Sequence, residues 1–128
     1  RTQEIVDEVL HTLYFNEPNG LSGNEDCGQM SAWYILNAMG FYQVCPGKSV
    51  YSIGRPLFNE ATVHLKDGKS FKVIAHNNSR DNKYVQSIVL NGNKLETPFF
   101  THQDIVDGGT LELTMGAEPL MPDNELRK

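Results

Sequence analysis

Residues 61–76 read ATVHLKDGKSFKVIAH, and the fold class follows from this stretch. Two runs rich in β-branched and apolar residues, 61–65 and 70–76, flank the tetrapeptide Lys66-Asp67-Gly68-Lys69. An Asp-Gly pair between such runs favours a β-hairpin, because the tight turn needs positive φ angles that these two residues tolerate. The sequence therefore predicts two antiparallel strands joined at Asp67-Gly68.

The same pattern recurs towards the C-terminus. Residues 83–90 (KYVQSIVL) and 94–97 (KLET) flank Asn91-Gly92-Asn93, and residues 110–115 (TLELTM) follow Asp107-Gly108-Gly109. Both alternating sets of side chains in 83–90 are largely apolar, which predicts a central strand covered on both faces. We expect four to five antiparallel strands in all.

Before residue 46 the periodicity is helical. Apolar residues between Ile5 and Tyr14 recur on one face of an amphipathic helix, and Asn16, Pro18 and Gly20 break it. A second helix, 28–39, is apolar on most sides, and Gly40 suits the left-handed residue that ends a helix. The predicted fold class is therefore α+β, with two N-terminal helices (1–45, a helical hairpin), an antiparallel sheet region (46–118) and a tail (119–128).

Composition excludes several functions. The 128 residues suit one domain or part of a larger protein, and a formal net charge of −5 argues against binding nucleic acid by bulk charge. We expect no membrane span, because no apolar run approaches about 18 residues, and no signal peptide is visible in this chain. Cys27 and Cys45 either stay unpaired or form one bridge, worth roughly 3 kcal/mol in the chain-entropy model.

One loop carries the residue types of a catalytic or binding site: GLSGNEDCGQ, residues 20–29. Glycines allow tight turns and close approach to a ligand, and the carboxylates of Glu25 and Asp26 can act as a general base, a metal ligand or a clamp on sugar hydroxyls. A purely structural interpretation competes, because Asp26 followed by Gln29 matches a capping box, worth about 1 kcal/mol. The two interpretations can coexist.

These residues resemble a known family. GLSGNEDCGQMSAWYILNAMGFYQVCPG (20–47) is similar to the motif of the calcium-dependent α-mannosidases of glycoside hydrolase family ninety-two. The resemblance extends over about residues 3–118, in the blocks LYFNEPNG (13–20), YSIGRPLF (51–58), KSFKVIAHNNS (69–79), NKYVQSIVLNG (82–92) and FTHQDIVDGGTLELTMG (100–116). A match of this length and order is highly specific.

The resemblance implies a fold and a site. The two helices would be the last of an (α/α) toroid, and the chain would be the C-terminal fragment of a longer inverting exo-α-mannosidase that removes terminal mannose from glycans. Asp26 lies at a general-base position of the family motif. Asn24 stands where many members carry a second acid, so we expect it to bind water or sugar, with Glu25 as the fallback base. Gly23, Asn24 and Glu25 are the expected substrate-binding residues.

The resemblance also implies what this chain lacks. Its calcium ligands would lie mostly upstream and none can be placed here, and the general acid would also be upstream. Adjacent Glu25 and Asp26 are poorly placed as an inverting pair, whose carboxyls stand about 6.5–9.5 Å apart. We therefore expect the isolated chain to be inactive. Its partners would be mannose-containing glycans and the rest of the polypeptide, in a periplasmic, secreted or cell-surface location of a bacterium.

An alternative is a non-catalytic role, in which the strands form an accessory or carbohydrate-binding module. Other residues favour ordinary structure over function. Trp33 suits core packing better than a sugar-stacking platform. His102 and Asp104 suit a polar turn better than a metal site, while His64 and His76 read as half-exposed strand residues and His11 as a helix-surface residue. Asn77-Asn78-Ser79 matches a glycosylation sequon, relevant only in a eukaryotic secretory setting.

Overall fold

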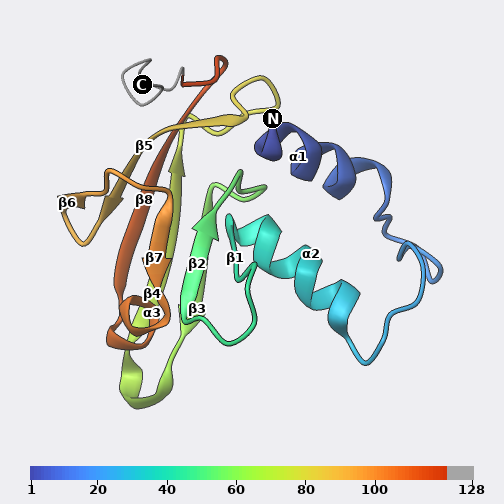
Figure 1. Ribbon diagram of the computed structural model, residues 1–128, viewed down its shortest axis with the longest axis horizontal. Helices are drawn as coiled ribbons and strands as arrows, with labels where there is room; N and C mark the ends of the chain where they lie inside the picture. Colours follow the sequence, from blue (N-terminus) through green and yellow to red (C-terminus); the bar gives the residue numbers. More distant parts are fainter. Residues whose placement is uncertain (121–128) are drawn as a thin grey trace, which may run out of the picture.

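A computed structural model describes residues 1–120, and within them the chain forms three α-helices and eight strands (Figure 1). The helices are α1 (Thr2–Thr12), α2 (Gln29–Met39) and α3 (His102–Asp107), with a short 3₁₀ turn, η1 (Lys66–Gly68). The strands are β1 (Phe41–Tyr42), β2 (Val50–Ile53), β3 (Glu60–His64), β4 (Ser70–His76), β5 (Tyr84–Leu90), β6 (Asn93–Lys94), β7 (Phe99–Thr101) and β8 (Gly109–Gly116). The predicted α+β class is confirmed, while residues 121–128 of the predicted tail lie outside the described residues.

The main sheet has five strands in the order β3-β4-β8-β5-β6. Every neighbouring pair is antiparallel except β4 and β8, which run parallel, with Val73 opposite Leu111 and Ala75 opposite Leu113. The central strand is thus β8, and β5 lies one place from the edge, which corrects the expectation that 83–90 would be central. One face of this sheet is buried, with Phe71, Leu111 and Leu113 fully inaccessible.

A second, three-stranded sheet, β1-β2-β7, covers part of that buried face and was not predicted. Its Phe41 and Phe100 rings contact Phe71 of β4, with ring centres 6.4 and 5.7 Å apart. Aromatic rings prefer such edge-on and stacked arrangements. This aromatic cluster joins the two sheets into one hydrophobic core.

Both predicted turns are present. Asp67 and Gly68 have φ angles of 62° and 74°, and Asn91 and Gly92 have φ angles of 50° and 80°. Asn91 also fixes the start of β8, because its Oδ1 accepts a hydrogen bond from the Thr110 N–H at 2.8 Å. Gly109 has a φ of 131°, and a Cβ there would lie 2.0 Å from that oxygen. A larger residue would therefore be strained and would displace the Asn91 side chain from its hydrogen bond.

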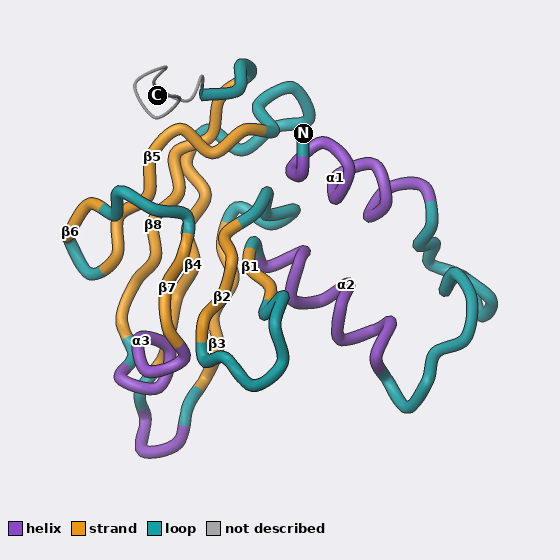
Figure 2. Tube along the Cα trace, in the orientation of Figure 1, coloured by secondary structure: helices purple, strands orange, loops and turns teal. Residues whose placement is uncertain are grey.

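The helices α1 and α2 project from the sheets, and the loop that joins them lies at the far end of the molecule (Figure 2). α1 buries Leu10 fully but leaves Ile5 about half exposed, at 49%, and Ile35 of α2 is 55% exposed. Gly40 ends α2 at a φ of 99°, as predicted. Among the described residues, no helix has the length and hydropathy that crossing a bilayer requires.

Candidate active-site loop

The loop between α1 and α2 folds back on itself through backbone contacts. The Phe15 N–H donates to the Gly20 carbonyl at 2.9 Å, and the Gly20 N–H donates to the Glu17 carbonyl at 2.9 Å. Gly20 is buried in this closure, where a Cβ would lie 1.9 Å from the Phe15 carbonyl oxygen. The first glycine of the loop is therefore needed to close it.

The backbone enters α2 through a left-handed run. Asp26, Cys27 and Gly28 have φ angles of 46°, 61° and 93°. Left-handed conformations cost roughly 1–2 kcal/mol at each non-glycine residue, so other contacts must hold Asp26 and Cys27 in place. Strain of this kind concentrates at functional sites.

The predicted capping box at Asp26 and Gln29 is wrong. The N-cap of α2 is Gly28, and no side chain caps the helix in the usual way. A capping residue normally has an extended backbone, and Asp26 instead has a positive φ two positions before the cap. Its side chain is exposed to solvent and available for other chemistry.

Glu25 fastens the loop to the helix. Its Oε1 accepts a hydrogen bond from the Ser31 N–H at 3.2 Å, and its backbone carbonyl accepts one from the Met30 N–H at 3.4 Å. A negative charge is stabilised at a helix N-terminus by the unpaired N–H groups and the helix dipole. The other carboxylate oxygen, Oε2, is buried without a hydrogen-bond partner among residues 1–120.

Tyr14 supports the other side of the loop. Its ring stacks on Trp33 at 5.7 Å and lies 4.9 Å from the Tyr34 ring, and its hydroxyl donates to the Met30 carbonyl at 3.5 Å. Burial raises the pKa of Tyr14, and the negative charge of Glu25 raises it further. Beside the Tyr14 ring is a cavity of about 440 Å³, lined by Tyr14, Phe15, Asn16, Gly20, Leu21, Ser31, Tyr34 and Ile35.

The expected site residues thus separate into two environments. Gly23, Asn24 and Asp26 are exposed, whereas Glu25 is half-buried and engaged with α2. Trp33 packs between Tyr14 and Tyr42, whose ring lies edge-on at 6.4 Å. It remains half-buried, which agrees with the core-packing interpretation.

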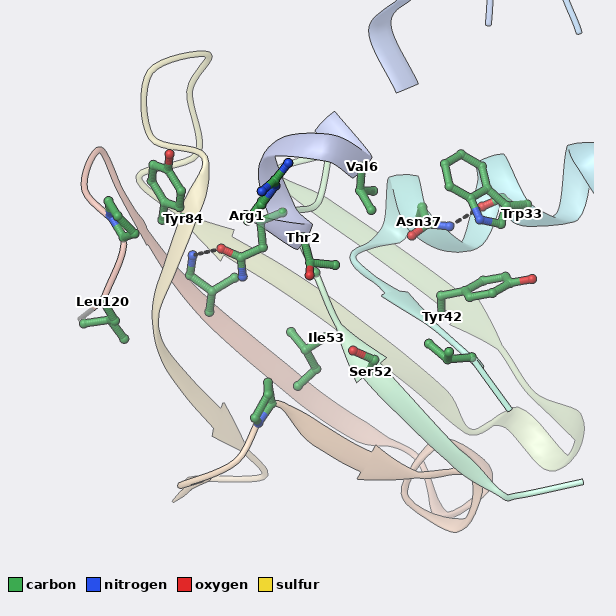
Figure 3. Close-up of a pocket in the computed structure, with 16 residues that line it drawn as sticks. Arg1, Thr2, Val6, Trp33, Asn37, Tyr42, Ser52, Ile53, Tyr84 and Leu120 are labelled. Carbon is green, nitrogen blue, oxygen red and sulfur yellow. Dashed lines mark hydrogen bonds between the residues drawn. The ribbon is translucent and has the colours of Figure 1, made fainter. Parts of the chain in front are cut away.

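A larger cavity lies elsewhere, between the start of α1, α2, β2 and β5 (Figure 3), with a volume of about 630 Å³. Among residues 1–120 its lining contains Trp33, Asn37, Tyr42, Ser52 and Tyr84 but no Asp or Glu. The polar side chains there are partly engaged, since Asn37 Nδ2 donates to the Trp33 carbonyl and the Tyr84 hydroxyl donates to Glu4. The carboxylates of Glu25 and Asp26 thus belong to the loop before α2 and not to the described wall of this cavity.

The residues do not fit a calcium site by themselves. Calcium takes six to eight oxygen ligands, largely from carboxylates and carbonyls. Within residues 1–120 no three His, Cys, Asp or Glu side chains form a group able to hold a metal ion. His102 and Asp104 begin α3 instead, where Asp104 forms a capping box with Thr101 and His102 Nδ1 lies 3.1 Å from the Tyr51 hydroxyl.

The two cysteines and the strand histidines lie at the surface of the molecule. Cys27 and Cys45 are both free thiols and exposed. His76 pairs with Glu112 of β8 at 2.9 Å on the exposed face of the sheet, and His64 is an exposed residue of β3. His11 lies on the surface of α1, where it contacts Asp7 at 3.2 Å.

Known proteins are similar to this chain over most of its length. The family model described as "Glycosyl hydrolase family 92 catalytic domain" matches residues 1–117. A secreted glycosidase, otherwise uncharacterized, from Arthroderma benhamiae is 34% identical over 108 residues, which cover 81% of this chain and 14% of that protein.

Solved structures agree with this match. One is a family GH92 α-mannosidase from Bacteroides thetaiotaomicron in complex with mannoimidazole, with a TM-score of 0.85, 41% identity and coverage of 91% of this chain and 15% of that one. Another is a family GH92 inverting mannosidase from the same species, with a TM-score of 0.83, 44% identity and coverage of 92% and 16%. The chain therefore spans about a sixth or less of the length of these relatives.

Proposed function

The chain belongs to glycosyl hydrolase family 92, a family with known mannosidases, and from this premise we propose that it is the C-terminal part of a longer inverting exo-α-mannosidase. In this proposal its loop 20–28 supplies the general base, Asp26. The observation that carries the proposal is the exposed Asp26 carboxylate, held on a left-handed turn directly before α2.

Each loop residue then has a role. Asp26 takes the proton from a water molecule as that water attacks the anomeric carbon of the terminal mannose. Asn24 and Gly23 contact this water or the sugar hydroxyls. Glu25, tied to the Ser31 N–H, is a positioning residue that keeps the strained Asp26–Gly28 turn in place.

The general acid belongs to another segment. Inverting hydrolysis needs two carboxyls about 6.5–9.5 Å apart, and the neighbouring Glu25 is already bonded to the N-terminus of α2. The acid, most of the sugar pocket and the calcium ligands would come from the rest of the polypeptide. The roles proposed for Asp26, Asn24 and Glu25 do not depend on calcium.

We also propose that the enzyme acts on mannose-containing glycans outside the cytoplasm, in the periplasm, at the cell surface or as a secreted protein. The secreted Arthroderma relative and the mannosidase relatives support this. A bacterial source would accord with the Bacteroides relatives.

The decisive experiment replaces Asp26 in the longer enzyme. Asp26→Asn should reduce turnover of an aryl α-mannoside by roughly 10²–10⁴-fold, the usual contribution of general-base catalysis, and leave mannose binding largely intact. Asp67→Asn is the matched control, because Asp67 is also an exposed aspartate with positive φ, at 62°, but lies in a distant hairpin. Its turnover should equal that of the wild type.

Glu25→Gln separates the base from its fallback. If Glu25 only positions the turn, Glu25→Gln should lower turnover less than Asp26→Asn does. It should also change both KM and kcat. A near-normal rate for Asp26→Asn would instead favour the non-catalytic accessory module. The isolated 128-residue chain should show no mannosidase activity, and measurable turnover by it would contradict the proposed division of the site.

A further inference from the structure

A second polar cavity lies where α1 meets the β2–β3 and β4–β5 connections, away from loop 20–28. It has a volume of about 300 Å³ and is lined by His11, Arg55, Leu57, Asn59, Asn78, Ser79 and Arg80. In Figure 1 the yellow connection between β4 and β5 lies beside the start of α1. Nothing in the proposed glycosidase mechanism uses these residues.

Arg55 is the buried charge of this cavity. Its side chain is 5% exposed, its Nη1 lies 2.7 Å from Asp7 Oδ1, and its Nη2 donates to the Ser79 carbonyl at 3.2 Å. The N–H of the third guanidinium nitrogen, Nε, is buried and has no partner within residues 1–120. A buried donor on a charged group is costly to leave unpaired, so an acceptor in the cavity would be stabilised there.

The described residues that line this cavity include two arginines and no Asp or Glu. Asp7 pairs with Arg55 at 2.7 Å and also lies 3.9 Å from the Lys83 ammonium group. Arg80 adds a second guanidinium to the cavity wall. In a chain with a formal net charge of −5, this is a local site that attracts anions.

Asn78 restricts which anion fits. Its Nδ2 donates to the Leu57 carbonyl at 3.4 Å, which orients the amide and leaves Oδ1 buried without a partner among the described residues. The cavity therefore offers arginine donors and one amide acceptor. A hydrogen phosphate group matches both, because it has charged oxygens and an O–H, whereas sulfate only accepts.

We propose that this cavity binds a hydrogen phosphate group, either free or as a phosphomonoester, through Arg55, Arg80 and Asn78. The proposal concerns binding by the 128-residue chain and is independent of its role in glycan hydrolysis.

The test is an NMR titration of the chain with inorganic phosphate, sulfate and a hexose 6-phosphate, at ionic strength held constant with sodium chloride. The pH is held at about 5.5, because a phosphomonoester has a second pKa of about 6 and keeps its O–H only below it. We expect inorganic phosphate to shift the Arg55 Nε–H and the amide resonances of residues 78–80, with sulfate binding more weakly. Tighter binding of the hexose phosphate would assign the site to a phosphomonoester, and equal or weaker binding would assign it to free phosphate. The absence of shifts with both phosphates would overturn the proposal and leave only water in the cavity.

The matched variants are Arg80→Ala and Lys66→Ala, which remove the same charge from exposed residues at opposite ends of the molecule. Loss of one charge-assisted contact should weaken phosphate binding about tenfold in Arg80→Ala. Lys66→Ala should leave it unchanged. Equal affinities in the two variants, or equal binding of sulfate and phosphate by the wild type, would overturn the assigned contacts.

Discussion

The five-stranded sheet and the helical arm, residues 1–39, are stabilised in different ways. The sheet buries Phe71, Leu111 and Leu113 completely, in one continuous core with the aromatic rings of the second sheet. The helical arm leaves large apolar side chains partly exposed on both helices and the loop: Ile5, Leu13, Phe15, Leu21 and Ile35. The sheet region has its own core, whereas several large apolar side chains of the arm stay exposed to solvent.

Polar contacts fasten α1 to the sheet region, whereas the end of α2 packs Leu36 and Met39 against the core. Asp7 reaches the buried Arg55, Glu4 accepts from the Tyr84 hydroxyl, and Gln3 Oε1 accepts from the Val85 N–H at 3.4 Å. Few buried apolar contacts and exposed surface are the marks of a region that opens locally at low cost. We therefore expect α1 and the loop that presents Asp26 to open more easily than the sheets.

The strongest test of this contrast compares one core side chain with one arm side chain. Phe71→Ala removes a fully buried ring and should lower the free energy of unfolding by about 3–5 kcal/mol. Ile35→Ala, at a residue 55% exposed, should change it by less than about 1 kcal/mol. Urea unfolding of the two variants measures both values, and similar losses would show that the arm shares the core's stability.

The next largest effect concerns the anchor of α1. Asp7→Asn leaves Arg55 buried without its counter-charge and should cost about 3 kcal/mol. Amide hydrogen exchange should then speed up across α1 while β4 and β8 stay protected. Glu8→Gln, at an exposed acid of the same helix, is the control and should leave exchange unchanged. Uniform acceleration over the sheet would contradict a separately anchored arm.

The smallest effect is a pH dependence that arises in the arm. The pKa of Tyr14 is raised from 10.0, chiefly by burial, so the folded chain holds the phenol proton more tightly than the unfolded chain. Both states are protonated below pH 10, and above it the unfolded state ionises first, so stability falls as the pH rises through this range. Tyr14→Phe should flatten this alkaline decline in thermal unfolding, and an unchanged slope would place its origin elsewhere.

Local turn chemistry explains what the sequence predicted well. Asp67-Gly68 and Asn91-Gly92 adopt positive φ angles for reasons contained in two residues, so both hairpins were foreseeable. Gly40 ends α2 for the same kind of reason. The glycines, the acids and the family motif of residues 20–29 likewise mark this loop as the candidate site, and that stays a prediction.

Non-local pairing and strained backbone explain what was missed. The sheet β1-β2-β7 joins β1 and β2, which are close in sequence, to β7, which is far from both. All three strands have only two to four residues, and no local pattern identifies such short strands. For α3 there was a signal, Thr101 followed three residues later by Asp104, which forms a capping box. At Asp26 the capping pattern misled, because the left-handed run through Cys27 moves the helix start to Gly28.

The position of β8 has a consequence for how the chain is made. This strand, which ends at Gly116, lies at the centre of the sheet. β4 and β5 each pair with β8 and do not pair with each other. During synthesis β4 and β5 leave the ribosome before β8, and their hydrogen-bonding edges towards β8 stay unpaired until it follows. Assembly of the sheet must therefore follow synthesis of β8, and until then these edges are the surfaces that a chaperone would need to shield.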